Sequence, residues 1–178
     1  TDGSADGVTV LKQGWGVEPL TEGQAACVST MSYNEYWVVR DAGYSPEELT
    51  VFKYQAEGAA TLEDGLYVHE KNMSDPVFKD KMVRFVRASM KGWKYAEENP
   101  KEAAMIILDN DDAGVQTEKH QVRMMGEIAK LTAGSNGALD PADYERTVKV
   151  LMSGASDPVI TKKPSGAWTH EITNAALK

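Results

Sequence analysis

The densest group of side chains able to recognise a ligand lies in the stretch MSYNEYW at residues 31–37. Tyr33, Tyr36 and Trp37 offer flat aromatic faces on which a ring can stack. The Glu35 carboxylate can accept paired hydrogen bonds from an amidine-like or aminopyrimidine edge. These residue types indicate a site for a small ring that carries hydrogen-bond donors.

The same stretch also fits a purely structural role. Ser32 followed by Glu35 three residues later has the spacing of a helix capping box, which explains both polar residues without a ligand. Trp37 can simply face the core. Taken alone, the residues favour the cap over the ligand site.

A second polar group lies in the stretch QAEGAATLEDG at residues 55–65. Glu57 and Asp64 each precede a glycine, and glycine permits the backbone rotation that a hinge needs. The segment therefore suits a hinge that also contacts ligand. A surface turn explains it as well, because Asp-Gly is common in turns, and without further context the turn is favoured.

Other chemistries have little support in the sequence. His69, His120 and His170 are scattered and show no zinc-ligand spacing, so no metal site is predicted. Cys27 is the single cysteine and lies in an apolar stretch, which predicts a small core residue. The acidic run at residues 109–112 lacks the glycine and distal glutamate of a calcium loop and is expected to be a solvated connection. No cofactor is predicted.

The elements that must position these residues fall into two parts. The first third of the chain alternates short strands and helices, which is typical of a parallel, doubly wound α/β sheet. The rest is expected to be mostly helical, with Asp-Pro and Asn-Pro pairs marking helix starts. The expected strands are Val8–Leu11, Ala26–Thr30, Thr50–Tyr54 and Leu66–His69. The expected helices are at residues 19–24, 32–42, 117–132 and 168–177, after Asp75, after Asn99, and from Asp140 to Met152, with a turn at Ser45–Glu48.

Composition sets limits on function. The 178 residues carry a net charge of −8, and an acidic balance argues against a nucleic-acid partner. The longest apolar run, Ala103–Leu108, is far shorter than the ~20 residues of a membrane span. Thr1–Gly7 is polar and has no signal-peptide pattern, and the abrupt start is expected to be a cut through a larger protein.

Several segments, taken in order, resemble the solute-binding proteins of ABC importers. The branch concerned includes binders of thiamine-pyrimidine precursors, with nitrate, alkylsulfonate, taurine and riboflavin binders as relatives. The matching stretches are PLTEGQAA at 19–26, SYNEY at 32–36, LEDGLYV at 62–68, VRFVRASMKGW at 83–93 and AEENPKEAA at 96–104. The family often has Asp in the first of these stretches, where this chain has Gln24-Ala25-Ala26.

The resemblance implies a two-lobed, type II periplasmic-binding-protein fold of the α/β class, present here in part. Residues 1–54 would be the latter part of lobe two, residues 55–65 the crossover hinge, and residues 66–178 a mostly helical return to lobe one. The N-terminal half of the family's proteins would be missing and would be a partner of this chain.

The resemblance also shifts the balance at the first polar group. In such proteins this region lines the ligand cleft, which favours Tyr33, Asn34, Glu35 and Trp37 as ligand contacts, with Glu57 and Asp64 at the hinge. Glu35 suits a nitrogen heterocycle better than nitrate or a sulfonate, because like charges repel in a poorly solvated site. The implied protein is periplasmic or a membrane-anchored extracellular lipoprotein, passes its ligand to an importer permease, and performs no chemistry.

Three alternatives remain open. The pyrimidine synthase of thiamine biosynthesis shares this fold and is an enzyme, but it carries a cysteine-rich motif near the crossover, where residues 56–65 have no cysteine. A helical interaction domain without a small ligand would instead bury Tyr33 and Glu35 as caps. A sulfonate or nitrate binder is a further possibility within the family.

Overall fold

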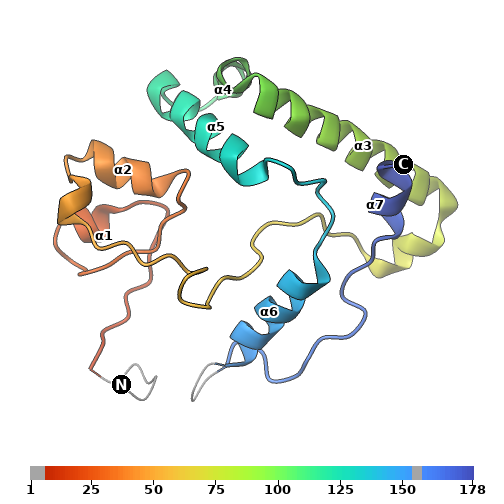
Figure 1. The fold of residues 1–178 in the computed structure, drawn as a ribbon, viewed down its shortest axis with the longest axis horizontal. Coiled ribbons are helices and arrows are strands. Elements are labelled where there is room, and N and C mark those ends of the chain that lie inside the picture. Colours follow the sequence, from red (N-terminus) through yellow and green to blue (C-terminus); the bar gives the residue numbers. More distant parts are fainter. Residues whose placement is uncertain (1–6, 154–157) are drawn as a thin grey trace. The chain divides into compact units, whose positions relative to one another are not determined.

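The structure, a computed structural model, describes residues 7–153 and 158–178, and this part of the chain is helical (Figure 1). The opening residues 1–6, whose start was interpreted as a cut, lie outside it. In chain order the elements are α1 (Glu18–Thr21), α2 (Glu35–Asp41), the 3-10 turns η1 (Pro46–Glu48) and η2 (Glu70–Ser74), α3 (Pro76–Glu98), α4 (Pro100–Asp109), α5 (Glu118–Thr132), α6 (Pro141–Met152) and α7 (Glu171–Ala176).

The helix starts follow from local sequence. Asp140 accepts a hydrogen bond from the Ala142 N–H at 2.7 Å, and Pro141 occupies the first position of α6. Asp75 does the same for the Val77 N–H at 2.8 Å at the start of α3. A side-chain acceptor satisfies a backbone donor that the helix itself cannot satisfy, so these predicted helices are confirmed.

The predicted α/β fold is wrong for the described residues, which contain no strand and no sheet. Each of the four stretches expected to be strands runs outside regular secondary structure. No backbone hydrogen bond, for example, joins residues 66–68 to another described segment. A β-branched sequence favours an extended backbone, but a strand also needs a neighbour to complete its hydrogen-bond ladder. With no sheet, the type II periplasmic-binding-protein fold is not what the structure shows.

The described part of the chain divides into two compact units, each formed by stretches that are separate in the sequence. One unit comprises Phe52–Lys91 and Ser135–Lys178, and the other comprises Gly7–Val51 and Gly92–Gly134. We call the second the α4–α5 unit and the first the α6–α7 unit. The helix α3 begins in the α6–α7 unit, and its last turns from Gly92 belong to the α4–α5 unit.

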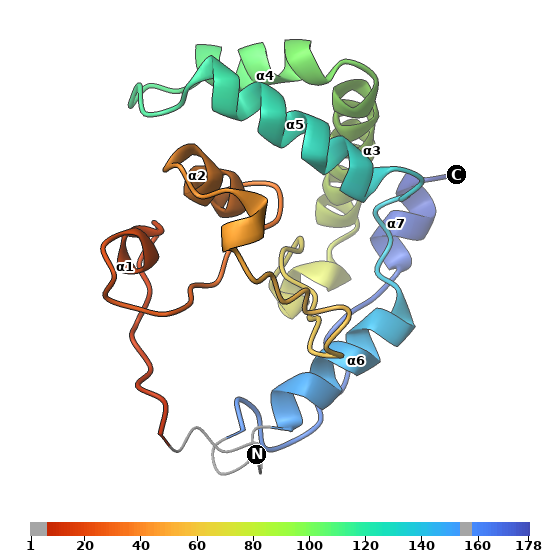
Figure 2. The same cartoon turned by 60° about the vertical axis from the view of Figure 1, so that its left-hand side comes forward.

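The core of the α4–α5 unit lies between its two longest complete helices, which contact each other and lie next to one another in Figure 2. Ala103 and Ala104 of α4 and Met125 of α5 are buried there, and the other side chains packed against them are Ala96, Ile107, Val122 and Ile128. Small alanines let the helices approach closely, and methionine fills the irregular remaining space. The prediction that Cys27 is a core residue is wrong, because its side chain is exposed.

In the α6–α7 unit, long-range polar contacts hold the last helix on α3. Arg87 donates to the carbonyl oxygens of Ala175 and Ala176, both at 3.1 Å, and so satisfies free acceptors at the end of α7. Lys79 forms an ion pair with Glu171 at 2.6 Å at the other end. Both ends of α7 are thus fixed to one face of α3.

Candidate functional site

The residues predicted to contact ligand gather at the start of α2. This helix begins at Glu35, with Asn34 in the N-cap position. The expected capping box between Ser32 and Glu35 is absent from the described structure. Instead, the Oε2 atom of Glu35 accepts a hydrogen bond from the Met31 N–H at 2.8 Å. The carboxylate therefore reaches one residue further back and closes the turn that precedes the helix.

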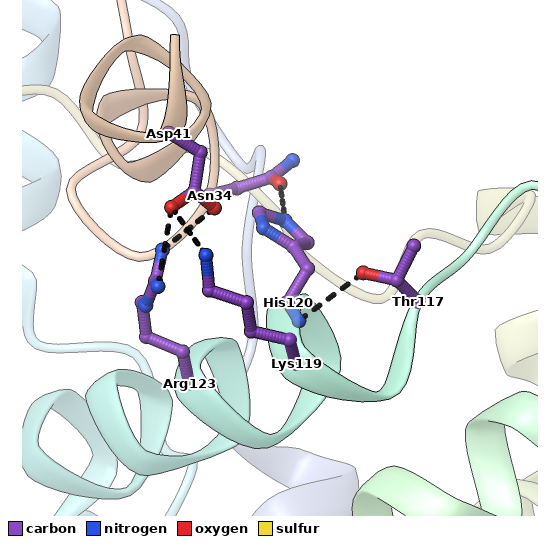
Figure 3. Close-up of polar contacts among 6 residues, drawn as sticks. All are labelled: Asn34, Asp41, Thr117, Lys119, His120 and Arg123. Atoms are coloured by element: carbon purple, nitrogen blue, oxygen red, sulfur yellow. Dashed lines mark hydrogen bonds and ion pairs between the residues drawn. The ribbon is translucent and has the colours of Figure 1, made fainter. Parts of the chain in front are cut away.

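Asn34 connects this carboxylate to a distant part of the chain. Its Nδ2 donates to Glu35 Oε1 at 3.1 Å. Its Oδ1 lies 2.8 Å from Nε2 of His120 on α5 (Figure 3). All three side chains are half-buried. Because 86 residues separate Asn34 from His120, this contact is tertiary, and it brings α5 to the predicted ligand residues.

The other end of α2 is fixed to α5 by charge. Both carboxylate oxygens of Asp41 accept hydrogen bonds from the Arg123 guanidinium, at 2.9 and 3.3 Å, and Lys119 lies 3.0 Å from Oδ1 (Figure 3). Hydrogen bonds from Arg123 and then Lys119 lower the pKa of Asp41 below its ordinary value. We call Asp41, Lys119 and Arg123 the α2–α5 clamp.

The aromatic side chains of α2 contact other side chains of the protein, which limits the surface they can offer to a ligand. The Arg123 guanidinium lies over the Trp37 ring, 4.9 Å from its centroid, in a cation–π arrangement. Tyr36 meets Trp37 edge to face at 5.3 Å. The ring face of Trp37 that carries the guanidinium cannot stack a ligand, so stacking by this residue is limited to its other face.

The sequence of α5 explains why one helix supplies all these partners. Thr117 caps it by accepting from the His120 N–H at 3.3 Å. At 100° per residue, Lys119, His120 and Arg123 share one face of the helix. The buried residues Gln121 and Met125 lie on the opposite face, toward the core. Packing of α5 on α4 therefore presents the polar face to α2.

The predicted site residues fall into two different units. Tyr33, Asn34, Glu35 and Trp37 all lie at α2 in the α4–α5 unit, and all are half-buried. Glu57 and Asp64 belong to the α6–α7 unit, where both are exposed. The sequence analysis missed the four partners Asp41, Lys119, His120 and Arg123.

Two further observations concern the described residues only. No three His, Cys, Asp or Glu side chains within 7–153 and 158–178 converge in a way that could hold a metal ion. Among the described helices, none is both long enough and apolar enough to cross a membrane.

The arrangement at α2 is a polar and aromatic cluster suited to hydrogen-bonding a small molecule. A family profile described as NMT1/THI5 like matches residues 1–103, and the chain belongs to that family. The family includes substrate-binding proteins of ABC transporters and proteins of thiamine synthesis, so it supports a small-molecule binder in general terms. The match includes α2 but ends before α5. No curated protein and no solved structure matches the chain.

Proposed function

We propose that this protein is the solute-binding component of an ABC importer and binds a small nitrogen heterocycle of the thiamine-pyrimidine type. Tyr33, Asn34, Glu35 and Trp37 would make the contacts, and the ligand would pass unchanged to a permease. The proposal places the protein outside the cytoplasm, in the periplasm or anchored to the outer face of a membrane. Membership of the NMT1/THI5-like family supports the general class.

The observation that carries the choice of ligand is the way the Glu35 carboxylate is held. A carboxylate has about four acceptor positions, and Glu35 uses two of them, for the Met31 N–H and Asn34 Nδ2. The remaining positions suit the amino group and ring N–H donors of an aminopyrimidine. A neutral or cationic ring is favoured over an anion, because a fixed carboxylate repels negative charge.

The cationic side chains nearby raise the alternative of a nitrate or sulfonate binder. Lys119 and Arg123 carry positive charges, which attract anions. Both, however, already pair with the Asp41 carboxylate, at 3.0 and 2.9 Å. An anionic ligand would have to compete with that internal partner, so the structure favours the heterocycle.

Calorimetry tests the proposal directly. The protein is titrated with an aminopyrimidine precursor of thiamine, riboflavin, taurine and nitrate, and the series is repeated with Glu35→Gln. We expect the aminopyrimidine to bind and the variant to weaken it by about tenfold or more, as for loss of a hydrogen bond to a charged group. Glu63→Gln, which removes an exposed carboxylate of the other unit, is the control and should leave affinity unchanged.

Three results would contradict the proposal. Tight binding of taurine or nitrate that Glu35→Gln does not affect would replace the heterocycle by an anion. Turnover of any tested ligand, including turnover with pyridoxal phosphate and iron, would favour the pyrimidine-synthase-like alternative. Recovery of the protein from the cytosol of fractionated cells would contradict its export.

A further inference from the structure

The chain His120–Asn34–Glu35 has a fixed hydrogen-bond direction. An ionised carboxylate can only accept, so the atom of the Asn34 amide that faces Glu35 at 3.1 Å must be the Nδ2 donor. The amide oxygen then faces His120 at 2.8 Å and requires a hydrogen on Nε2. A flipped amide would instead place its oxygen against the carboxylate, where the two acceptors repel.

We propose that His120 is a positioning residue for the ligand site. By donating to Asn34 Oδ1, it locks the amide so that Nδ2 supports Glu35, and Glu35 keeps its other acceptor positions for the donors of the ligand. This inference rests on the proposed function, because it assigns the residue that orients the proposed ligand contact. It also gives α5, which lies outside the matched part of the family, a role in specificity.

The surroundings of the histidine agree with this role. The side chains of His120, Asn34 and Glu35 are half-buried, so water competes less for their hydrogen bonds than at an exposed site. The ring of His120 is carried by the first turn of α5, a helix that the α2–α5 clamp holds against α2. Because the helix that carries the His120 ring is held in place, its N–H donor can keep the Asn34 amide in one orientation.

The first test reads the hydrogen-bond direction without any ligand. Long-range nitrogen–proton NMR at about pH 8, where histidine side chains are ordinarily neutral, reports which ring nitrogen carries the hydrogen. We expect the Nε2–H tautomer at His120. We also expect the Asn34 side-chain amide signals to move in His120→Leu and to stay in place in Thr117→Ala. A dominant Nδ1–H tautomer would overturn the proposal.

The second test measures binding of the aminopyrimidine precursor. His120→Leu removes the donor, and we expect affinity to fall by about tenfold, as for one lost hydrogen bond in a half-buried site. His120→Gln carries an N–H donor close to the place of Nε2 and should bind within about threefold of the parent. Asn34→Asp keeps the acceptor for His120 but sets a second carboxylate beside Glu35, so it should lose at least as much affinity as His120→Leu.

Thr117→Ala separates positioning from helix stability, because it removes only the N-cap of α5. We expect this variant to unfold more easily and to bind normally. Parent-like affinity in both His120→Leu and Asn34→Asp would overturn the proposal. Failure of the parent itself to bind the aminopyrimidine would instead overturn the proposed function, while the NMR result would still decide the direction of the hydrogen bonds.

Discussion

The α2–α5 clamp makes a quantitative prediction for the variant Asp41→Asn. The substitution keeps the shape of the side chain and removes its charge. The Arg123 fork, with bonds of 2.9 and 3.3 Å, contributes about 1 kcal/mol after allowance for a carboxylate that is 37% exposed. The Lys119 pair, with the lysine 71% exposed, adds only about 0.3 kcal/mol. Looser packing of Arg123 on Trp37 brings the expected loss to about 1.5 kcal/mol.

The assay must report on the contact between α2 and α5. Native-state hydrogen exchange of the α2 amides does so, because opening of this contact exposes them. A loss of about 1.5 kcal/mol speeds their exchange roughly tenfold. Urea unfolding gives the accompanying change in the free energy of unfolding.

Asp80→Asn is the matched control for charge and substitution type. Asp80 pairs with Arg84 within α3, and both side chains are about two-thirds exposed, at 68% and 65%. We expect a change of only about 0.3 kcal/mol there. Helix-dipole effects work against the expected difference, because Asp41 lies at the end of α2 and Asp80 near the start of α3. Equal losses of unfolding free energy in Asp41→Asn and Asp80→Asn would refute a stabilising role for the α2–α5 clamp.

The lowered pKa of Asp41 adds a pH dependence to the same experiment. Hydrogen bonds from Arg123 and Lys119 depress this pKa, so the unfolded chain binds a proton more readily than the folded chain. The stabilisation is therefore complete above the ordinary aspartate pKa of about 4 and is lost as the pH falls through the lower folded value. The difference in stability between parent and Asp41→Asn should shrink below about pH 4. If the stability difference between the parent and Asp41→Asn stayed constant with falling pH, Asp41 would not be the titrating group that stabilises this contact.

Three further predictions concern helix ends. Arg87→Met removes the donor to the last carbonyls of α7 and should speed exchange of the α7 amides about fivefold, whereas Arg84→Met on the same helix should leave them unchanged. Asp140→Ala should lower the free energy of unfolding by about 1 kcal/mol in urea, and Asp140→Ser, which keeps a capping oxygen, should recover most of it. Gly43 has φ +107° after α2, so Gly43→Ala should cost about 1 kcal/mol in the same assay, and an unchanged midpoint would contradict that strain.

The helices were predictable because their signals are local. Asp75 and Asp140 each precede a proline, and both cap helices within two residues of where the sequence places them. Ser45 and Glu48 form the predicted capping box. The strand predictions were wrong for the opposite reason, because a strand depends on a non-local signal. It needs a partner strand that can lie anywhere in the chain, and local composition does not reveal that partner. The predicted capping box between Ser32 and Glu35 was wrong because the Glu35 carboxylate accepts a hydrogen bond from the Met31 N–H, one residue earlier in the chain.

The partners of the site were missed because the contacts that define it join residues separated by nearly half of the chain. Lys119 and Arg123 reach Asp41 across 78 and 82 residues. The sequence nonetheless contained a sign of this contact, in the form of uncompensated charges on α5 and α2. Lys119 and Arg123 are two cations four residues apart on one face of α5, and such pairs repel by about 0.2–0.5 kcal/mol. His120 adds a further hydrogen-bond donor to the same face. Such a face is stable when an acceptor from another element neutralises it. The solitary acid at the end of α2, where the helix dipole disfavours negative charge, needs a cationic partner for the same reason. Two local conflicts of opposite sign therefore pointed to one contact, and the structure shows that they resolve each other.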